Sequence, residues 1–299
     1  MKTVRRDIVK FILTSSLYPC IFVHAAAVAS EASPIHHYFS REMVLDYMIR
    51  LGEKGYDPTN IEAVKKALSD PSYSTRNYAI RLLAARQGKE ALPILTKALD
   101  DPSQMVRCSA ATLLAVFGDK RGLNRMQKDL ADFTPKKSVV DIDQSTDMDD
   151  RQKLEAKRQR RLQLKDAIAA AKVLAEFGDH RGYDLAVQVI KSDESAIRKA
   201  EAVEILSLIS NSNLEVLRAE NHDPDAVLLA LAQTAYEGVV VTTLIRSALI
   251  HRRPEVGMTI LETLSRAPQV AEDQRKDAER SLEYLKQKIH KVGQDKTKN

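Results

Sequence analysis

Oxygen-bearing side chains alternate along one acidic stretch in the middle of the chain, "DIDQSTDMDDRQ". They occupy positions one, three, five, seven and nine of a calcium-loop pattern, and they are Asp141, Asp143, Ser145, Asp147 and Asp149. Alternate oxygen ligands suit a hard cation such as Ca²⁺. However, Thr146 stands where the loop needs glycine, and Gln152 stands where it needs a bidentate glutamate. We therefore expect a solvated helix start with no metal, and calcium binding is the alternative.

A basic run follows, "KRQRR" from Lys157 to Arg161. Such a run can bind nucleic acid or anionic lipid. It carries no aromatic residues on which bases could stack. The prediction is a solvated helix face, with no nucleic-acid partner.

Signals of catalysis are missing. The sequence has no Gly-rich phosphate loop, no Gly-x-Ser-x-Gly elbow and no His-Glu dipeptide. His36, His37 and Glu42 are near one another in sequence, but their spacing does not place them on one helix face. We therefore expect a protein that is not an enzyme and that carries no cofactor.

The first 29 residues have the composition of a secretory signal. A basic head with Lys2, Arg5, Arg6 and Lys10 precedes an apolar run that closes on Ala27-Val28-Ala29. An uncleaved membrane anchor is the rival interpretation. A lipid-anchored Cys20 is disfavoured because bulky residues precede it. The prediction is a periplasmic or secreted protein with no transmembrane segment after signal removal.

Removal of this segment changes the charge of the chain. The 299 residues carry 46 Lys and Arg against 41 Asp and Glu, a net charge of +5. Residues 1–29 contain four of the bases and one acid, so 42 bases and 40 acids remain and the net charge falls to +2. The weak positive charge removes the main argument for a nucleic-acid partner.

Three stretches of the chain are nearly copies of one another. Arg76 aligns with Arg107, 31 residues later, and "FGDKRG" from Phe117 is followed by "FGDHRG" from Phe177, 60 residues later. A fixed period near 30 residues indicates stacked supersecondary units. Aromatic residues make up only 5% of the chain, which favours helices over a β-sandwich.

Each unit reads as two helices. Asp101-Pro102-Ser103 is a helix start, and apolar residues then recur at spacings of three and four, forming one face with Val106, Ala110, Leu113, Leu114 and Phe117. Gly118 is expected to end the helix in the left-handed conformation. Ala110-Ala111 and Ala170-Ala171 would let neighbouring helices approach closely.

The pattern "DPSxxVRxxAAxxLxxFGD" resembles the HEAT-like repeat, including the variety found in phycobilisome lyases. The resemblance covers Asp57 to about Leu206. It implies an all-α fold, an α-solenoid of stacked HEAT-like helical pairs with helical caps, whose Asp-Pro helices line the concave face. It also implies a structural ladder in which Arg76, Arg107 and Arg198 pair with acidic residues of adjacent units. Ala167 takes the arginine position in the third unit and breaks the ladder there.

The repeats divide the chain into a series of expected parts. A helix is expected from about Asp147 to Phe177, begun by a capping box of Thr146 and Asp149. The expected parts are a signal peptide (1–29), an N-terminal capping helix (30–56), HEAT-like repeats (57–132), a charged insertion leading into a long helix (133–164), further HEAT-like repeats (165–210), degenerate helical repeats with a C-terminal cap (211–292) and a disordered tail (293–299).

Stacked helices present an extended concave surface without a cleft. We therefore expect an exported, non-enzymatic bacterial scaffold that binds a protein or peptide on the concave face. The predicted contacts are residues taken to be exposed there: Asn77, Arg81, Thr112 and Lys172. The alternative, from the family resemblance, is a phycobilin-lyase-like or other enzyme accessory protein that binds a small molecule.

Overall fold

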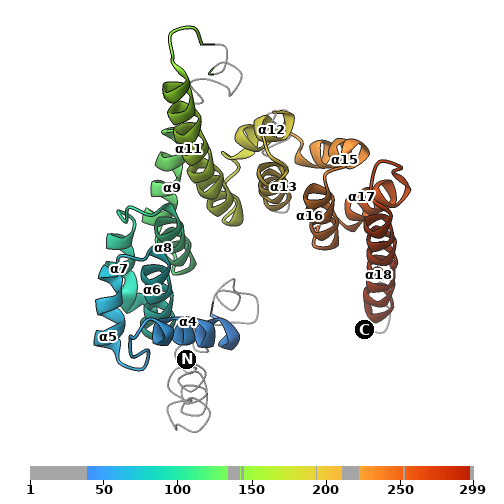
Figure 1. Cartoon of the computed structure of the whole chain (residues 1–299). Coiled ribbons are helices and arrows are strands. Elements are labelled where there is room, and N and C mark those ends of the chain that lie inside the picture. The colour runs from blue at the N-terminus through green and yellow to red at the C-terminus, as the bar shows by residue number, and fades with distance from the viewer. Residues whose placement is uncertain are drawn as a thin grey trace. The chain divides into compact units, whose positions relative to one another are not determined.

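The computed structural model describes residues 39–133, 142, 145–192, 194–210, 222–251 and 253–296. In these ranges every regular element is a helix, which confirms the predicted all-α solenoid (Figure 1). The chain divides into two compact parts, Met1–Lys128 and Asp129–Asn299. They are called unit one and unit two below. The predicted signal segment lies outside the described residues.

Helix α6 lies at the centre of unit one, packed between α4 and α8. Short 3₁₀ turns, Ala67–Ser69 and Gly88–Ala91, precede and follow α6. The helices of this unit, the last of which crosses the division between the units, are α4 (Arg41–Glu53), α5 (Ile61–Lys66), α6 (Tyr73–Gln87), α7 (Leu92–Ala98), α8 (Gln104–Val116) and α9 (Arg121–Ala131).

The Asp-Pro-Ser starts of α6 and α8 work in the same way. The carboxylate of Asp70 accepts a hydrogen bond from the Ser72 backbone N–H, and Asp101 accepts one from Ser103, both at 2.8 Å. Each aspartate therefore stabilises the turn that directly precedes its helix. At the other end, Gly118 has φ 83°, which confirms the predicted left-handed helix end.

The small residues hold helix pairs close together. A Cβ atom on Gly122 would lie 2.4 Å from the carbonyl oxygen of Ala111, and one on Gly182 would lie 2.7 Å from the Ala171 Cβ. The prediction that Ala111 and Ala171 allow close approach is confirmed. The second glycine of each FGD-x-RG motif supplies the other side of that contact.

The predicted apolar face of α8 is the core of unit one. Val106, Ala110, Leu113 and Leu114 each expose 1% or less of their surface. This burial confirms the register read from the spacing of the apolar residues.

Unit two contains a row of helices in which α13 packs on both α11 and α16, and α16 packs on α18 (Figure 1). A second set, α12, α15 and α17, packs against members of that row. The bounds are α11 (Asp150–Glu176), α12 (Tyr183–Lys191), α13 (Ala196–Ser210), α15 (Pro224–Thr234), α16 (Gly238–Leu249), α17 (Pro254–Arg266) and α18 (Glu272–Lys296).

The long helix α11 begins later than predicted. Its N-cap is Asp149, whose carboxylate accepts from the Gln152 backbone N–H at 2.7 Å, while the Gln152 side chain accepts from the Asp149 N–H at 2.9 Å. The expected capping box at Thr146 is therefore wrong, because Asp149 and Gln152 form this reciprocal pair one turn later.

Candidate functional site

The predicted contact residues of unit one do not form an open surface. Asn77 and Thr112 are buried, with exposed fractions of 9% and 7%. The prediction that they are exposed is wrong, because α6 is covered by α4 and α8, and α8 is covered by α6 and α7. A helix packed on two sides leaves only a narrow stripe open to a partner.

Arg81 joins three neighbouring helices. Its guanidinium donates to the Ser109 hydroxyl on α8 at 2.8 Å and to the Tyr47 hydroxyl on α4 at 3.3 Å. Its Nε donates to Asn77 Oδ1 at 3.4 Å, and its Cζ lies 5.9 Å from the centre of the Tyr47 ring. These contacts use the donors of Arg81 inside the unit, so they stabilise the stacking of α4, α6 and α8.

Lys172, the fourth predicted contact, lies at an open cavity of unit two. Its ammonium group pairs with the Glu204 carboxylate across α11 and α13. The cavity has a volume of about 380 Å³ and is bounded by α11, α13 and α16. Its other lining residues are Glu176, Ser207, Leu208, Thr243, Arg246, Ser247, Leu249 and Ile250. We call this surface the α13–α16 groove.

The floor of the α13–α16 groove carries hydroxyl groups that already have hydrogen-bond acceptors. The Ser207 hydroxyl donates to the Val203 carbonyl, and the Thr243 hydroxyl donates to the Val239 carbonyl, both at 2.8 Å. The rim differs, because Ile250 is 70% exposed and Arg246 is exposed as well. Among the described residues, no carboxylate pairs with Arg246.

The sequence carried a signal for this groove that was missed. Arg246 is the single charged residue in the otherwise apolar or hydroxylic helix "GVVVTTLIRSAL". A lone charge in such a helix points away from the core.

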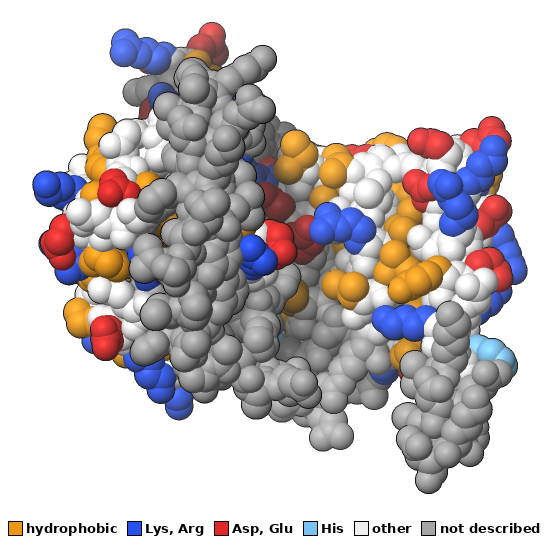
Figure 2. Space-filling view, turned by 90° about the horizontal axis from the view of Figure 1, so that it is seen from below, with side chains coloured by type: hydrophobic (Ala, Val, Ile, Leu, Met, Phe, Trp, Pro, Cys, Tyr) orange, Lys and Arg blue, Asp and Glu red, His pale blue; other side chains and the backbone are white. Residues whose placement is uncertain are grey.

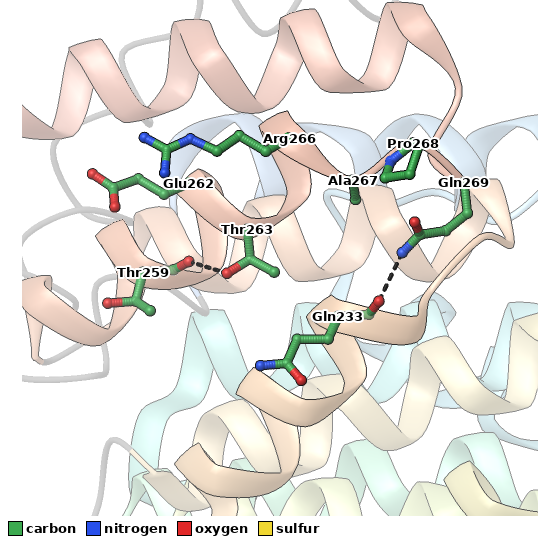
Figure 3. A pocket seen from close by; sticks show the side chains of 8 residues that line it. All are labelled: Gln233, Thr259, Glu262, Thr263, Arg266, Ala267, Pro268 and Gln269. Carbon is green, nitrogen blue, oxygen red and sulfur yellow. Dashed lines mark hydrogen bonds between the residues drawn. The ribbon is translucent and has the colours of Figure 1, made fainter.

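A second cavity, of about 370 Å³, lies beside α15 and α17 (Figure 3). The Gln269 amide donates to the Gln233 carbonyl at 2.7 Å, and the Thr263 hydroxyl donates to the Thr259 carbonyl at 2.7 Å. Its apolar lining is limited to Ala267 and Pro268 beside the polar side chains. This cavity offers a partner little hydrophobic contact.

The arginine ladder holds at one rung. Arg76 donates from Nε and from a terminal nitrogen to the two carboxylate oxygens of Asp101, both at 2.8 Å, and so joins one repeat to the next. Arg107 donates to the Asp101 carbonyl at 2.9 Å, and its pairing with an adjacent unit stays a prediction.

Among the described residues, Arg198 does not pair with an acidic residue of an adjacent unit. In the described part of the chain its guanidinium contacts Glu201, three residues later on its own helix. On a helix, residues three apart are neighbours, so Glu201 satisfies the guanidinium locally.

The ionisation of Asp101 explains why its ion pair with Arg76 is stable. Burial alone would raise the pKa of the Asp101 carboxyl group. Hydrogen bonds from Arg76 and from the Ser103 backbone, with the charges of Arg76 and Arg107, hold the pKa below its ordinary value instead. The carboxylate is therefore charged at neutral pH and is fixed at the helix start.

The acidic stretch is only partly described. Asp141 and Asp143 lie outside the described residues. Ser145 donates its hydroxyl to Asp147 Oδ1 at 3.0 Å, and Asp149 is occupied as the N-cap of α11. Among the described residues, no three His, Cys, Asp or Glu side chains gather so that they could hold a metal ion.

A serine, a histidine and an aspartate meet inside unit two, which sequence reasoning missed because they lie up to 41 residues apart. The Ser210 hydroxyl donates to Asp225 and lies 3.0 Å from His251 Nε2, which lies 3.2 Å from Asp225 Oδ1. The Arg253 guanidinium also contacts the Asp225 carboxylate. The ends of α13 and α16 and the starts of α15 and α17 converge here.

This arrangement cannot activate a nucleophile. The His251 Nδ1 atom accepts a hydrogen bond from the Arg253 backbone N–H at 3.1 Å, so the neutral ring carries its proton on Nε2. A catalytic triad needs Nε2 free to accept the serine proton. The His251 side chain is also 0% exposed. The cluster is therefore a buried polar contact between helix ends.

Burial lowers the pKa of His251 below the 6.5 of a free imidazole, against a smaller raising effect of the Glu255 charge. The folded state therefore binds the proton more weakly than the unfolded state. The contribution of neutral His251 to the free energy of unfolding is therefore complete above pH 6.5. It is lost as the pH falls below that value.

We expect the variant His251→Asn to show a smaller loss of stability between pH 7.5 and pH 5.5 than the wild type, because asparagine can still accept from Arg253 and does not titrate. Urea unfolding followed by circular dichroism at both pH values measures the difference. Equal pH dependence of the two proteins would contradict the assignment.

One comparison with known proteins identifies the repeated part of the chain. Residues 61–136 match the model of the family described as HEAT repeats. HEAT-like repeats are present in this chain. The matched range begins with α5 and includes α9. A search of curated proteins gave no match. In the described ranges, no helix has both the length and the apolar character needed to cross a membrane.

Proposed function

We propose that the protein is an exported, non-enzymatic scaffold and that it binds a segment of a partner protein in the α13–α16 groove. The observation that carries this proposal is the rim of the groove, where exposed Ile250 lies beside Arg246. An exposed aliphatic side chain next to a charge that no described carboxylate neutralises is a typical feature of an interaction surface. HEAT repeats commonly mediate protein interaction.

The hydroxyl groups on the groove floor support binding rather than catalysis. Ser207 and Thr243 donate to carbonyl groups of their own helices, so neither is held by a general base that would activate it. In the cluster around His251, Ser210, Asp225 and His251 expose only 1%, 4% and 7% of their surface. A tightly bound small molecule, seen by native mass spectrometry of the purified protein, would contradict the scaffold and favour an accessory role of the lyase type.

Export is proposed from the composition of residues 1–29. The basic head, the apolar run and the small residues at Ala27 and Ala29 are typical of a cleaved signal. Mass spectrometry of the mature protein in the exported fraction is expected to find Ser30 as the first residue. An intact Met1 in the cytosol would contradict export.

The variant Ile250→Asp is expected to abolish recovery of the partner from the exported fraction of the native host. The matched control is Leu154→Asp on α11, because Leu154 and Ile250 are each 70% exposed. Both variants should fold, since neither side chain contributes to the core. Equal partner recovery by the two variants, quantified by mass spectrometry, would contradict binding at the groove.

A further inference from the structure

We infer that the α13–α16 groove selects a peptide segment in which an aspartate or glutamate stands close to a bulky aliphatic residue. The inference rests on the proposed function and adds the chemistry of the partner. It follows from the charges of the groove and from the position of its apolar side chains.

Among the described lining residues of the groove, the charge of Arg246 has no opposite charge paired with it. Lys172 and Glu204 neutralise each other through their ion pair. Glu176 has an interaction of its own and is not free. Among the described lining residues this leaves Arg246 as the cation to be matched. An arginine guanidinium pairs best with a planar carboxylate, which it can hold through two parallel hydrogen bonds.

An apolar surface lies beside that cation. Ile250 follows Arg246 by four residues, so both side chains lie on the same face, about one turn apart. Leu208 on α13 and Leu249 on α16 are half-buried and also line the cavity. In Figure 2, hydrophobic and basic side chains likewise lie next to one another on the face of unit two that is in view. When a carboxylate of the bound peptide pairs with Arg246, the neighbouring residues of that peptide therefore lie against Leu208 and Ile250.

The cavity beside α17 provides the contrast. Arg266 is also exposed there, without an ion pair among the described residues. Its neighbours are Thr263, Glu262 and the amides of Gln233 and Gln269, and Figure 3 shows Glu262 on the same helix as Arg266. Within the described residues, an arginine without an ion pair is thus present at both cavities, and bulky aliphatic side chains line the one that holds Arg246 but not the one that holds Arg266. Arg266→Glu is therefore the matched control for Arg246→Glu.

Random dodecapeptides displayed on phage and selected on the immobilised full chain test the inference. Enriched sequences are expected to carry an acid near Leu, Ile or Val. In fluorescence anisotropy, a labelled selected peptide should bind Arg246→Glu about tenfold or more weakly than wild type, because like charges then face each other. Arg266→Glu should bind as the wild type does. A peptide with lysine in place of its acid should bind Arg246→Glu better than it binds wild type.

The outcomes separate the inference from the proposed function. Peptides that lose affinity with Ile250→Asp but bind Arg246→Glu as well as wild type would overturn the acidic preference and leave groove binding intact. Enriched peptides without acids would do the same. Failure to select any peptide, or selected peptides unaffected by both substitutions, would overturn the inference and the proposed function together.

Discussion

The variant Leu114→Ala is expected to unfold with a free energy about 2–5 kcal/mol lower than that of the wild type. Leu114 exposes none of its surface, and it lies in the face of α8 that forms the core of unit one. Truncation removes buried methyl groups and leaves a cavity, because helices held at the Ala111–Gly122 contact cannot close around it. Urea unfolding followed by circular dichroism measures the change.

Leu154→Ala is the matched control for Leu114→Ala. Leu154 is 70% exposed on α11, so the same chemical change should alter the free energy of unfolding by no more than about 0.5 kcal/mol. An unchanged unfolding curve for Leu114→Ala would contradict the packing of α8 described above.

The second large effect is expected from Asp225→Ala, which should lower the free energy of unfolding by about 3–5 kcal/mol. Asp225 is 4% exposed and contacts Ser210, His251 and Arg253. Its removal leaves the Arg253 guanidinium without its carboxylate and removes an acceptor where helix ends meet. Differential scanning calorimetry of the purified protein measures the loss, and native-state hydrogen exchange shows whether it is confined to unit two.

Asp277→Ala provides the comparison for Asp225→Ala. Asp277 also pairs with an arginine, Arg280, but the two side chains are 54% and 77% exposed on α18. Exposed pairs contribute about 0–1 kcal/mol, so this variant should be nearly as stable as the wild type. Equal effects at the two aspartates would show that burial does not determine the importance of the contact at Asp225.

The regular parts of the fold could be predicted from short-range patterns. Spacing of apolar residues identified the buried face of α8, where Val106, Leu113 and Leu114 lie. Glycine at the helix end required only the local conformation of Gly118. These features depend on residues within a few turns of one another, where sequence is informative.

The candidate site could not be predicted in the same way. Asn77 and Thr112 look like surface residues in a single helix, and only the neighbouring helices bury them. The contact of Ser210 with Asp225 and His251 depends on how four helix ends meet. The α13–α16 groove combines residues of three helices, and one of them, α16, lies in the part where the repeat pattern is degenerate.

Photo-crosslinking from position 250 tests the central claim, that a partner lies in the α13–α16 groove. Benzoylphenylalanine replaces Ile250 in one variant and Leu154 in the control, and both proteins are irradiated in the native host. The account predicts a covalent adduct with a protein partner from position 250 and none from position 154. No adduct from position 250, or equal adducts from both positions, would contradict it.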